Sequence, residues 1–190
     1  MLDVFLLLMY HINMEKKNRR IIFLDIDGVL QPYGKQDRFE HDLDQLRKDL
    51  AAKYHNDDFL QMDKYDLGAI YYDWDKNAVE RLRKLCTDVP AEIVISSDWR
   101  IFSPLSRLKE YFRLHDLDKF LTATIEQLGG DRRKEIAAYI ENNPDIHRFV
   151  ILDDDSFWRF DVHYPEQFVY CPGIFNEESY QKALSILTKE

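Results

Sequence analysis

Cysteine is scarce in this sequence, which contains two, Cys86 and Cys171, among 190 residues. Two cysteines do not make a disulfide scaffold or a four-ligand zinc site, and they favour a reducing compartment. Long apolar runs are also missing, since no segment approaches the roughly 20 apolar residues of a membrane-spanning helix. We therefore expect a cytoplasmic protein with no membrane partner.

Positive charge is in the minority, with 26 lysine and arginine residues against 35 aspartate and glutamate residues, a net charge of −9. An acidic surface repels phosphate backbones and anionic lipid headgroups, which disfavours a stand-alone nucleic-acid-binding protein but permits a local basic pocket. Hydrophobic residues make up 45% of the chain and charged residues 32%, enough to bury a core and solvate a surface.

The one candidate for a signal sequence is the apolar stretch from Val4 to Tyr10. No positively charged region precedes it and no small-residue cleavage site follows it, so a signal peptide is disfavoured. We interpret residues 1–19 as an N-terminal extension, either an extra apolar element or an upstream start. Residues 20–190 then form one domain, in which no internal repeat or low-complexity linker occurs.

Short apolar runs alternate with helical periodicities along that domain. The runs predict buried strands at residues 21–26, 91–95, 121–125, 149–152 and 168–170. Apolar spacing and capping signals predict helices at residues 38–54, 75–85, 132–141 and 177–188, and another from about Pro104. Because the strand runs lack polar alternation, we predict an α/β fold with a doubly wound, Rossmann-like parallel sheet of about five strands.

The segment from Gln31 to Asp73 is too long for an ordinary connection between a strand and a helix. We predict a small, partly helical cap insertion at about residues 31–73, over one end of the sheet. The apolar residues of its helix fall on one face: Phe39, Leu43, Leu46 and Leu50.

Polar residues follow three of the predicted strands, and they read Asp25-Ile26-Asp27-Gly28, Ser96-Ser97-Asp98 and Asp153-Asp154-Asp155. Ligands of such sheets bind beyond the carboxyl ends of the strands. Carboxylates gathered there raise one another's pKa unless something compensates, and a hard divalent cation such as Mg²⁺ is the simplest compensation. The serine hydroxyls and the basic triplet Arg132-Arg133-Lys134 suit the oxygens of a phosphate.

Asp25 and Asp27 are two residues apart, so both can face one substrate if the strand continues. One carboxylate can attack phosphorus as a nucleophile, and the other can protonate the leaving oxygen and then activate water. Gly28 permits a sharp turn and a close approach of the backbone to an anion.

In chain order, four segments resemble the haloacid dehalogenase (HAD) superfamily of phosphatases and phosphotransferases: FLDIDGVL at residues 23–30, IVISS at residues 93–97, the basic triplet, and VILDDD at residues 150–155. The segments VISSDWR and RRKEI, together with ILDDD, resemble more narrowly the small HAD domains found alone in bacteria and within multi-domain RNA repair proteins. The resemblance covers roughly residues 20–170.

The resemblance implies Asp25 as the nucleophile and Asp27 as the acid/base. It implies a phosphate ligand at Ser96, with Ser97 as a competitor, and another within the basic triplet, where Arg132, Arg133 and Lys134 stay open alternatives. The implied Mg²⁺ ligands are Asp25, the backbone carbonyl of Asp27, and Asp154, with Asp153 as its neighbour.

We therefore predict a Mg²⁺-dependent phosphomonoester hydrolase that acts through an aspartyl-phosphate. The alternatives are a phosphotransferase or mutase with the same nucleophile, and a polynucleotide-end phosphatase. A phosphorylated signalling receiver is disfavoured, because it lacks Asp-x-Asp-Gly after its first strand. The net charge favours a small or medium phosphorylated substrate first and a nucleic-acid end second, and no partner protein can be inferred.

Overall fold

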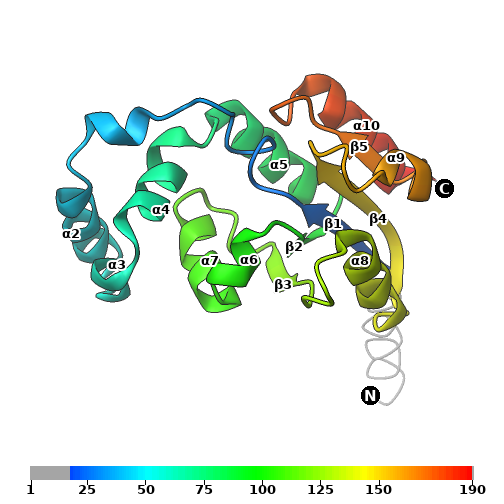
Figure 1. The fold of residues 1–190 in the computed structure, drawn as a ribbon, viewed down its shortest axis with the longest axis horizontal. Helices are drawn as coiled ribbons and strands as arrows, with labels where there is room; N and C mark the ends of the chain where they lie inside the picture. The colour runs from blue at the N-terminus through cyan, green and yellow to red at the C-terminus, as the bar shows by residue number, and fades with distance from the viewer. Residues whose placement is uncertain (1–17, 190) are drawn as a thin grey trace, which may run out of the picture.

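Five parallel strands form one sheet in the order β3-β2-β1-β4-β5 in the computed structural model, which describes residues 18–189 (Figure 1). The strands are β1 (Arg19–Leu24), β2 (Glu92–Ile95), β3 (Leu121–Thr124), β4 (Ile146–Asp153) and β5 (Phe168–Tyr170). Every pairing between neighbours is parallel. The predicted α/β class and parallel sheet are confirmed.

Both faces of the sheet are covered, which explains why the strand runs carry no polar alternation. Ile22 and Leu24 of β1 enter one apolar cluster, whereas Ile21 and Phe23 enter the other, and all four are fully buried. Figure 1 shows α5 and α10 on one side of the sheet and α8 on the other. The covering helices are α5 (Lys76–Asp88), α7 (Leu105–Arg113) and α10 (Glu177–Thr188) for the first cluster, and α8 (Arg132–Glu141) and α9 (Phe160–His163) for the second.

Between β1 and α5 the chain forms a helical insertion, seen at the left of Figure 1. Its elements are η1 (Asp37–Glu40), α2 (Leu43–Tyr54), α3 (Asp58–Gln61), α4 (Lys64–Gly68) and the π-helix η2 (Ala69–Asp73). The predicted helix over 38–54 was wrong at its start, because the Asp42 carboxylate accepts hydrogen bonds from the amides of Asp44 and Gln45 and caps α2 there. Phe39 therefore lies outside that helix and is 58% exposed.

A buried ion pair joins the two ends of the insertion. Asp73 is fully buried, and its carboxylate accepts hydrogen bonds from the backbone amide of Arg38 at 3.0 Å and from its guanidinium at 2.6 Å. The next residue, Trp74, stacks on the ring of His115, whose Nε2 contacts the carbonyl of Ile70 at 2.9 Å. These contacts fix the insertion to the layer of helices on the sheet.

Two short helices escaped prediction, α6 (Trp99–Phe102) and α9, because four residues carry no periodic signal. β1 and β4 also differ from their predicted bounds, 21–26 and 149–152, by two or three residues at one end or both.

The apolar stretch at residues 4–10 lies outside the described residues. Within the described part of the chain, no helix is both long and apolar enough to cross a membrane.

The buried pair gives a stability prediction. We expect Asp73→Asn to lower the free energy of unfolding by about 2–3 kcal/mol, because the guanidinium of Arg38 loses its counter-charge in a largely buried place. The matched control is Asp161→Asn, which removes the partner of Arg159 in a pair exposed on both sides and should lower stability far less. Urea unfolding of both variants measures the difference, and equal costs would contradict the assignment.

Candidate active site

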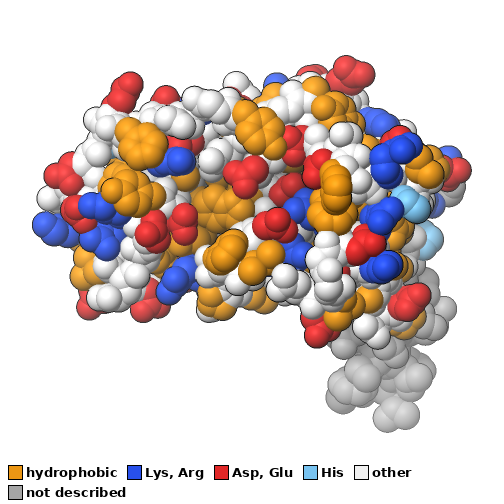
Figure 2. Space-filling view, viewed as in Figure 1, with side chains coloured by type: hydrophobic (Ala, Val, Ile, Leu, Met, Phe, Trp, Pro, Cys, Tyr) orange, Lys and Arg blue, Asp and Glu red, His pale blue; other side chains and the backbone are white. Residues whose placement is uncertain are grey.

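The carboxyl ends of β1, β2 and β4 meet at one edge of the sheet. The register pairs Leu24 with Ile95 on one side and with Leu152 on the other, so the residues that follow lie level with one another. A cavity of about 310 Å³, here called the carboxylate cavity, opens at this edge. Its lining residues are Asp25, Asp27, Tyr33, Ser97, Asp98, Arg132, Asp154, Asp155 and Ser156. Figure 2 shows acidic and basic side chains together near the middle of the face in view.

Asp25 directly follows β1 at this edge of the sheet, and three hydrogen bonds hold it in place. Its backbone amide donates to the carbonyl of Leu152 at 2.9 Å, which ties it to β4. One carboxylate oxygen accepts from the amide of Ile26 at 2.8 Å, and the other accepts from the Arg132 guanidinium at 2.7 Å. The side chain is therefore buried, paired with a cation and fixed in orientation.

Arg132 is the member of the basic triplet that reaches the carboxylates. Asp131 caps the start of α8, because its carboxylate accepts a hydrogen bond from the amide of Arg133. Arg132, the first helical residue, then points into the site. The same Arg132 Nη1 atom that contacts Asp25 donates to Asp153 at 2.8 Å, and Nη2 donates to Asp98 at 3.1 Å. The structure does not bring Lys134 to this site, since its side chain is 79% exposed and its ammonium faces Asp131 at 3.7 Å.

Two of the carboxylates that Arg132 contacts, Asp25 and Asp153, form a cluster with Asp154. Oxygen atoms of Asp25, Asp153 and Asp154 all lie within 4.8 Å of one another. Burial, and then the charge of Asp25, raise the pKa of Asp153 to about 7, although Arg132 opposes the shift. Burial and Asp25 likewise raise the pKa of Asp154. One cation does not balance this cluster of two buried carboxylates and one half-buried carboxylate, so the donor set fits a divalent metal ion that prefers oxygen ligands.

Gly28 lets the chain after β1 pass directly beside Asp154. Its φ is +70°, a conformation that residues with a Cβ atom adopt at a cost. A Cβ atom here would lie 2.0 Å from a carboxylate oxygen of Asp154. Gly28, the glycine of Asp-x-Asp-Gly, therefore leaves space for the carboxylate of Asp154, which follows β4.

Asp27 also lies in the cavity, and its partner was missed by sequence reasoning. The indole Nε1 of Trp99 donates to the Asp27 carboxylate at 2.9 Å. The position of Trp99 directly after Ser96-Ser97-Asp98 is the signal that could have identified it. Burial, and secondarily the charge of Asp25, raise the pKa of Asp27 despite this hydrogen bond. A raised pKa favours the protonated form, which can donate a proton.

The two serines after β2 are placed differently. Both serines are buried, but Ser97 contributes to the lining of the carboxylate cavity, whereas the hydroxyl of Ser96 has no hydrogen-bond partner. Arg100 holds this turn by donating to both serine carbonyls, at 2.5 and 2.8 Å, and to the buried carboxylate of Glu135 at 2.5 Å. Arg100 is therefore engaged in an ion pair with Glu135.

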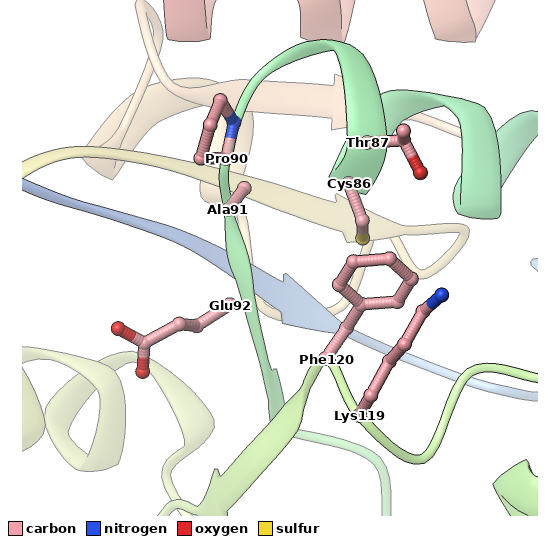
Figure 3. Close-up of a pocket in the computed structure, with 7 residues that line it drawn as sticks. All are labelled: Cys86, Thr87, Pro90, Ala91, Glu92, Lys119 and Phe120. Carbon is pink, nitrogen blue, oxygen red and sulfur yellow. The ribbon is translucent and has the colours of Figure 1, made fainter.

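A larger cavity at the other end of the sheet lacks such chemistry (Figure 3). It has a volume of about 560 Å³ and lies between the end of α5 and the starts of β2 and β3. Its carboxylate, Glu92, is paired with Arg19 at 2.8 Å. Burial raises the pKa of its cysteine, Cys86, to about 12, so the thiol is a poor nucleophile. The carboxylate cavity is therefore the candidate active site.

Comparison with known proteins identifies the family of this chain. The family model described as the HAD domain in Swiss Army Knife RNA repair proteins matches residues 21–174, which include every residue of the carboxylate cavity. The chain belongs to this family. No curated protein and no solved structure matches it. Membership of the HAD group implies phosphohydrolase chemistry, and the acidic triad of this HAD domain is consistent with the divalent metal that such chemistry uses.

The close approach at Gly28 gives a second prediction. Gly28→Ala should lower stability and reduce the rise in Tm that MgCl₂ produces, because the carboxylate of Asp154 must move to admit the methyl group. Gly34→Ala is the matched control, since Gly34 has a φ of +77° and nothing within 4 Å of an added Cβ. It should cost only the left-handed strain, about 1–2 kcal/mol, and keep the full response to Mg²⁺. Thermal unfolding with and without MgCl₂ checks this, and identical Mg²⁺ responses would refute it.

Proposed function

We propose that this HAD domain is a Mg²⁺-dependent phosphomonoester hydrolase that acts through a phosphorylated Asp25. The observation that carries the proposal is the buried Asp25 carboxylate, fixed by Arg132 beside Asp153 and Asp154, with Asp27 in the same cavity. Bound Mg²⁺ would be held by Asp25, Asp154 and the Asp27 carbonyl, with Asp153 beside them, and would offset the negative charge of carboxylates and phosphate.

In the first step, the Asp25 carboxylate attacks phosphorus and the bond from phosphorus to the ester oxygen breaks. Protonated Asp27 gives its proton to that leaving oxygen, so the alcohol departs neutral. In the second step, the Asp27 carboxylate removes a proton from water as its oxygen attacks phosphorus. The aspartyl-phosphate bond then breaks, which releases inorganic phosphate and restores both side chains.

The other groups bind and orient the phosphate. The hydroxyl of Ser97 lies in the cavity lining and can donate to a phosphate oxygen, a role that the sequence had assigned to Ser96 first. Arg132 holds the nucleophile in place and offsets the negative charge that gathers round phosphorus. The helical insertion, which the sequence predicted as a cap, would cover part of the mouth and leave room for bulky leaving groups.

The nucleophile gives a third prediction. Asp25→Asn should lower kcat at least about a thousandfold and keep the fold, because an amide does not form the acyl-phosphate. Acid-quenched reactions analysed by mass spectrometry should show a phosphorylated protein for the wild type and none for the variant. The exposed carboxylate variant Asp161→Asn is the control and should behave as the wild type. A kcat of Asp25→Asn close to that of the wild type would contradict the mechanism.

The acid gives a fourth prediction, which depends on the leaving group. Asp27→Asn should lower kcat/KM for an alkyl phosphate by about 10²–10⁴-fold, since an alkoxide leaves poorly without a proton. The loss should be much smaller for p-nitrophenyl phosphate, whose leaving group departs as a stable anion. Equal losses with both substrates would show that Asp27 does not act as the acid.

A nucleic-acid end is the second candidate substrate. The family description, with its reference to RNA repair, favours this class, while the net charge of −9 favours smaller phosphomonoesters. A phosphotransferase would use the same first step and differ in the acceptor, an alcohol in place of water. Release of inorganic phosphate in the absence of any added acceptor distinguishes the hydrolase from the transferase.

A further inference from the structure

Another cavity, distinct from the two described above, lies between the first turn of α8 and the end of α9. It has a volume of about 380 Å³, and its lining includes Arg133, Lys134, His163 and Tyr164. The hydroxyl of Tyr164 donates to the carbonyl of Arg133 at 3.2 Å and so holds the α9 side against α8. We call this cavity the α8–α9 groove.

Two segments of the chain connect the groove with the carboxylate cavity. Successive residues of an α-helix point about 100° apart, so Arg132 faces the carboxylates while Arg133 and Lys134 face the groove. After β4, Asp155 and Ser156 line the carboxylate cavity, and the same segment then supplies His163 to the groove. The two cavities are therefore neighbours on one surface.

An exposed aromatic residue lies on the segment that joins them. Phe157 directly follows Ser156 and is 75% exposed, with its ring edge-to-face against Trp158 at 4.9 Å. The guanidinium of Arg132 lies over the other ring of this pair at 5.6 Å. Figure 2 shows apolar side chains between the charged middle of the face and a group of basic and histidine side chains to its right. Such a ring offers a stacking surface for a nucleobase.

The groove is positively charged in a protein whose net charge is −9. Arg133 is paired with Asp131 at 2.9 Å, and its Nη1 atom lies 2.9 Å from Nε2 of His163. Lys134 lies 3.7 Å from the same carboxylate and is largely exposed. Two cations thus face one carboxylate, and the excess positive charge can be met by an anion from outside.

We propose that the α8–α9 groove is a second anion subsite, which binds a phosphate joined through one nucleoside to the phosphate in the carboxylate cavity. This inference rests on the proposed function. The nucleobase stacks on Phe157, and the second phosphate contacts Arg133 and Lys134. A nucleoside bisphosphate and the penultimate phosphodiester of a nucleic-acid strand offer this same chemistry.

Binding to Asp25→Asn tests the subsite without turnover. The ligands are adenosine 5′-phosphate, adenosine 3′-phosphate, adenosine 3′,5′-bisphosphate and a dinucleotide with a terminal phosphate. We expect the second phosphate to lower Kd at least about tenfold, as a charge-assisted contact allows, with a steeper loss in salt. Adding Arg133→Gln and Lys134→Gln to the Asp25→Asn variant should remove most of this gain. The gain is the ratio of the Kd values for a monophosphate and for the bisphosphate, measured in the same variant, so any change within the carboxylate cavity cancels. The tighter of the last two ligands identifies the source of the phosphate.

The control adds Lys48→Gln and Lys182→Gln, exposed positions on α2 and α10, which change the net charge by the same amount. The control should keep the gain. Equal affinity for monophosphates and bisphosphate would overturn the subsite, as would a gain that survives in the groove variant or is lost equally in the control. Failure of the wild-type protein to hydrolyse any of these ligands with Mg²⁺, while the affinity gain is present, would instead overturn the proposed function alone.

Discussion

The buried guanidinium of Arg132 is the interaction on which the rest of the site depends. It contacts Asp25 after β1, Asp153 at the end of β4 and Asp98 after β2, so one cation ties three strand ends together. Removing one partner from a buried ion pair commonly costs several kcal/mol, because the remaining charge is left without compensation. Here the carboxylates still outnumber the cation, which leaves the negative charge that a divalent ion can balance.

The parallel topology makes this contact possible. With β1 between β2 and β4, residues that are distant in the sequence leave the sheet at the same edge and at the same level. The remaining supports lie behind that edge. Arg100 and Glu135 fix the turn after β2 to α8, and Gly28 lets the backbone pass beside Asp154. Asp25, the proposed nucleophile, is thus positioned by rigid elements, which suits chemistry that depends on orientation.

The carboxylates of the candidate site follow the strands of the sheet, whereas the surrounding segments determine which ligands can reach the site. The insertion is fixed by the buried pair of Arg38 and Asp73, and Tyr33, in the same connection between β1 and α5, lines the carboxylate cavity. The segment after β4 carries an exposed aromatic ring, and the first turn of α8 carries cations that do not face the carboxylates. A negatively charged protein can therefore present a local positive surface next to the carboxylate cavity.

The sequence by itself determined the class of fold and the composition of the site. Buried parallel strands are continuous apolar runs, helix starts such as Asp131 carry local capping signals, and Asp-x-Asp-Gly is contiguous, so each could be identified from neighbouring residues. Tertiary structure alone decided that Arg132 points to the carboxylates rather than Lys134, that Ser97 rather than Ser96 lines the cavity, and that Trp99 donates to Asp27. The direction of a side chain depends on how its helix or turn is docked against the sheet, and residues nearby in the sequence do not encode that docking.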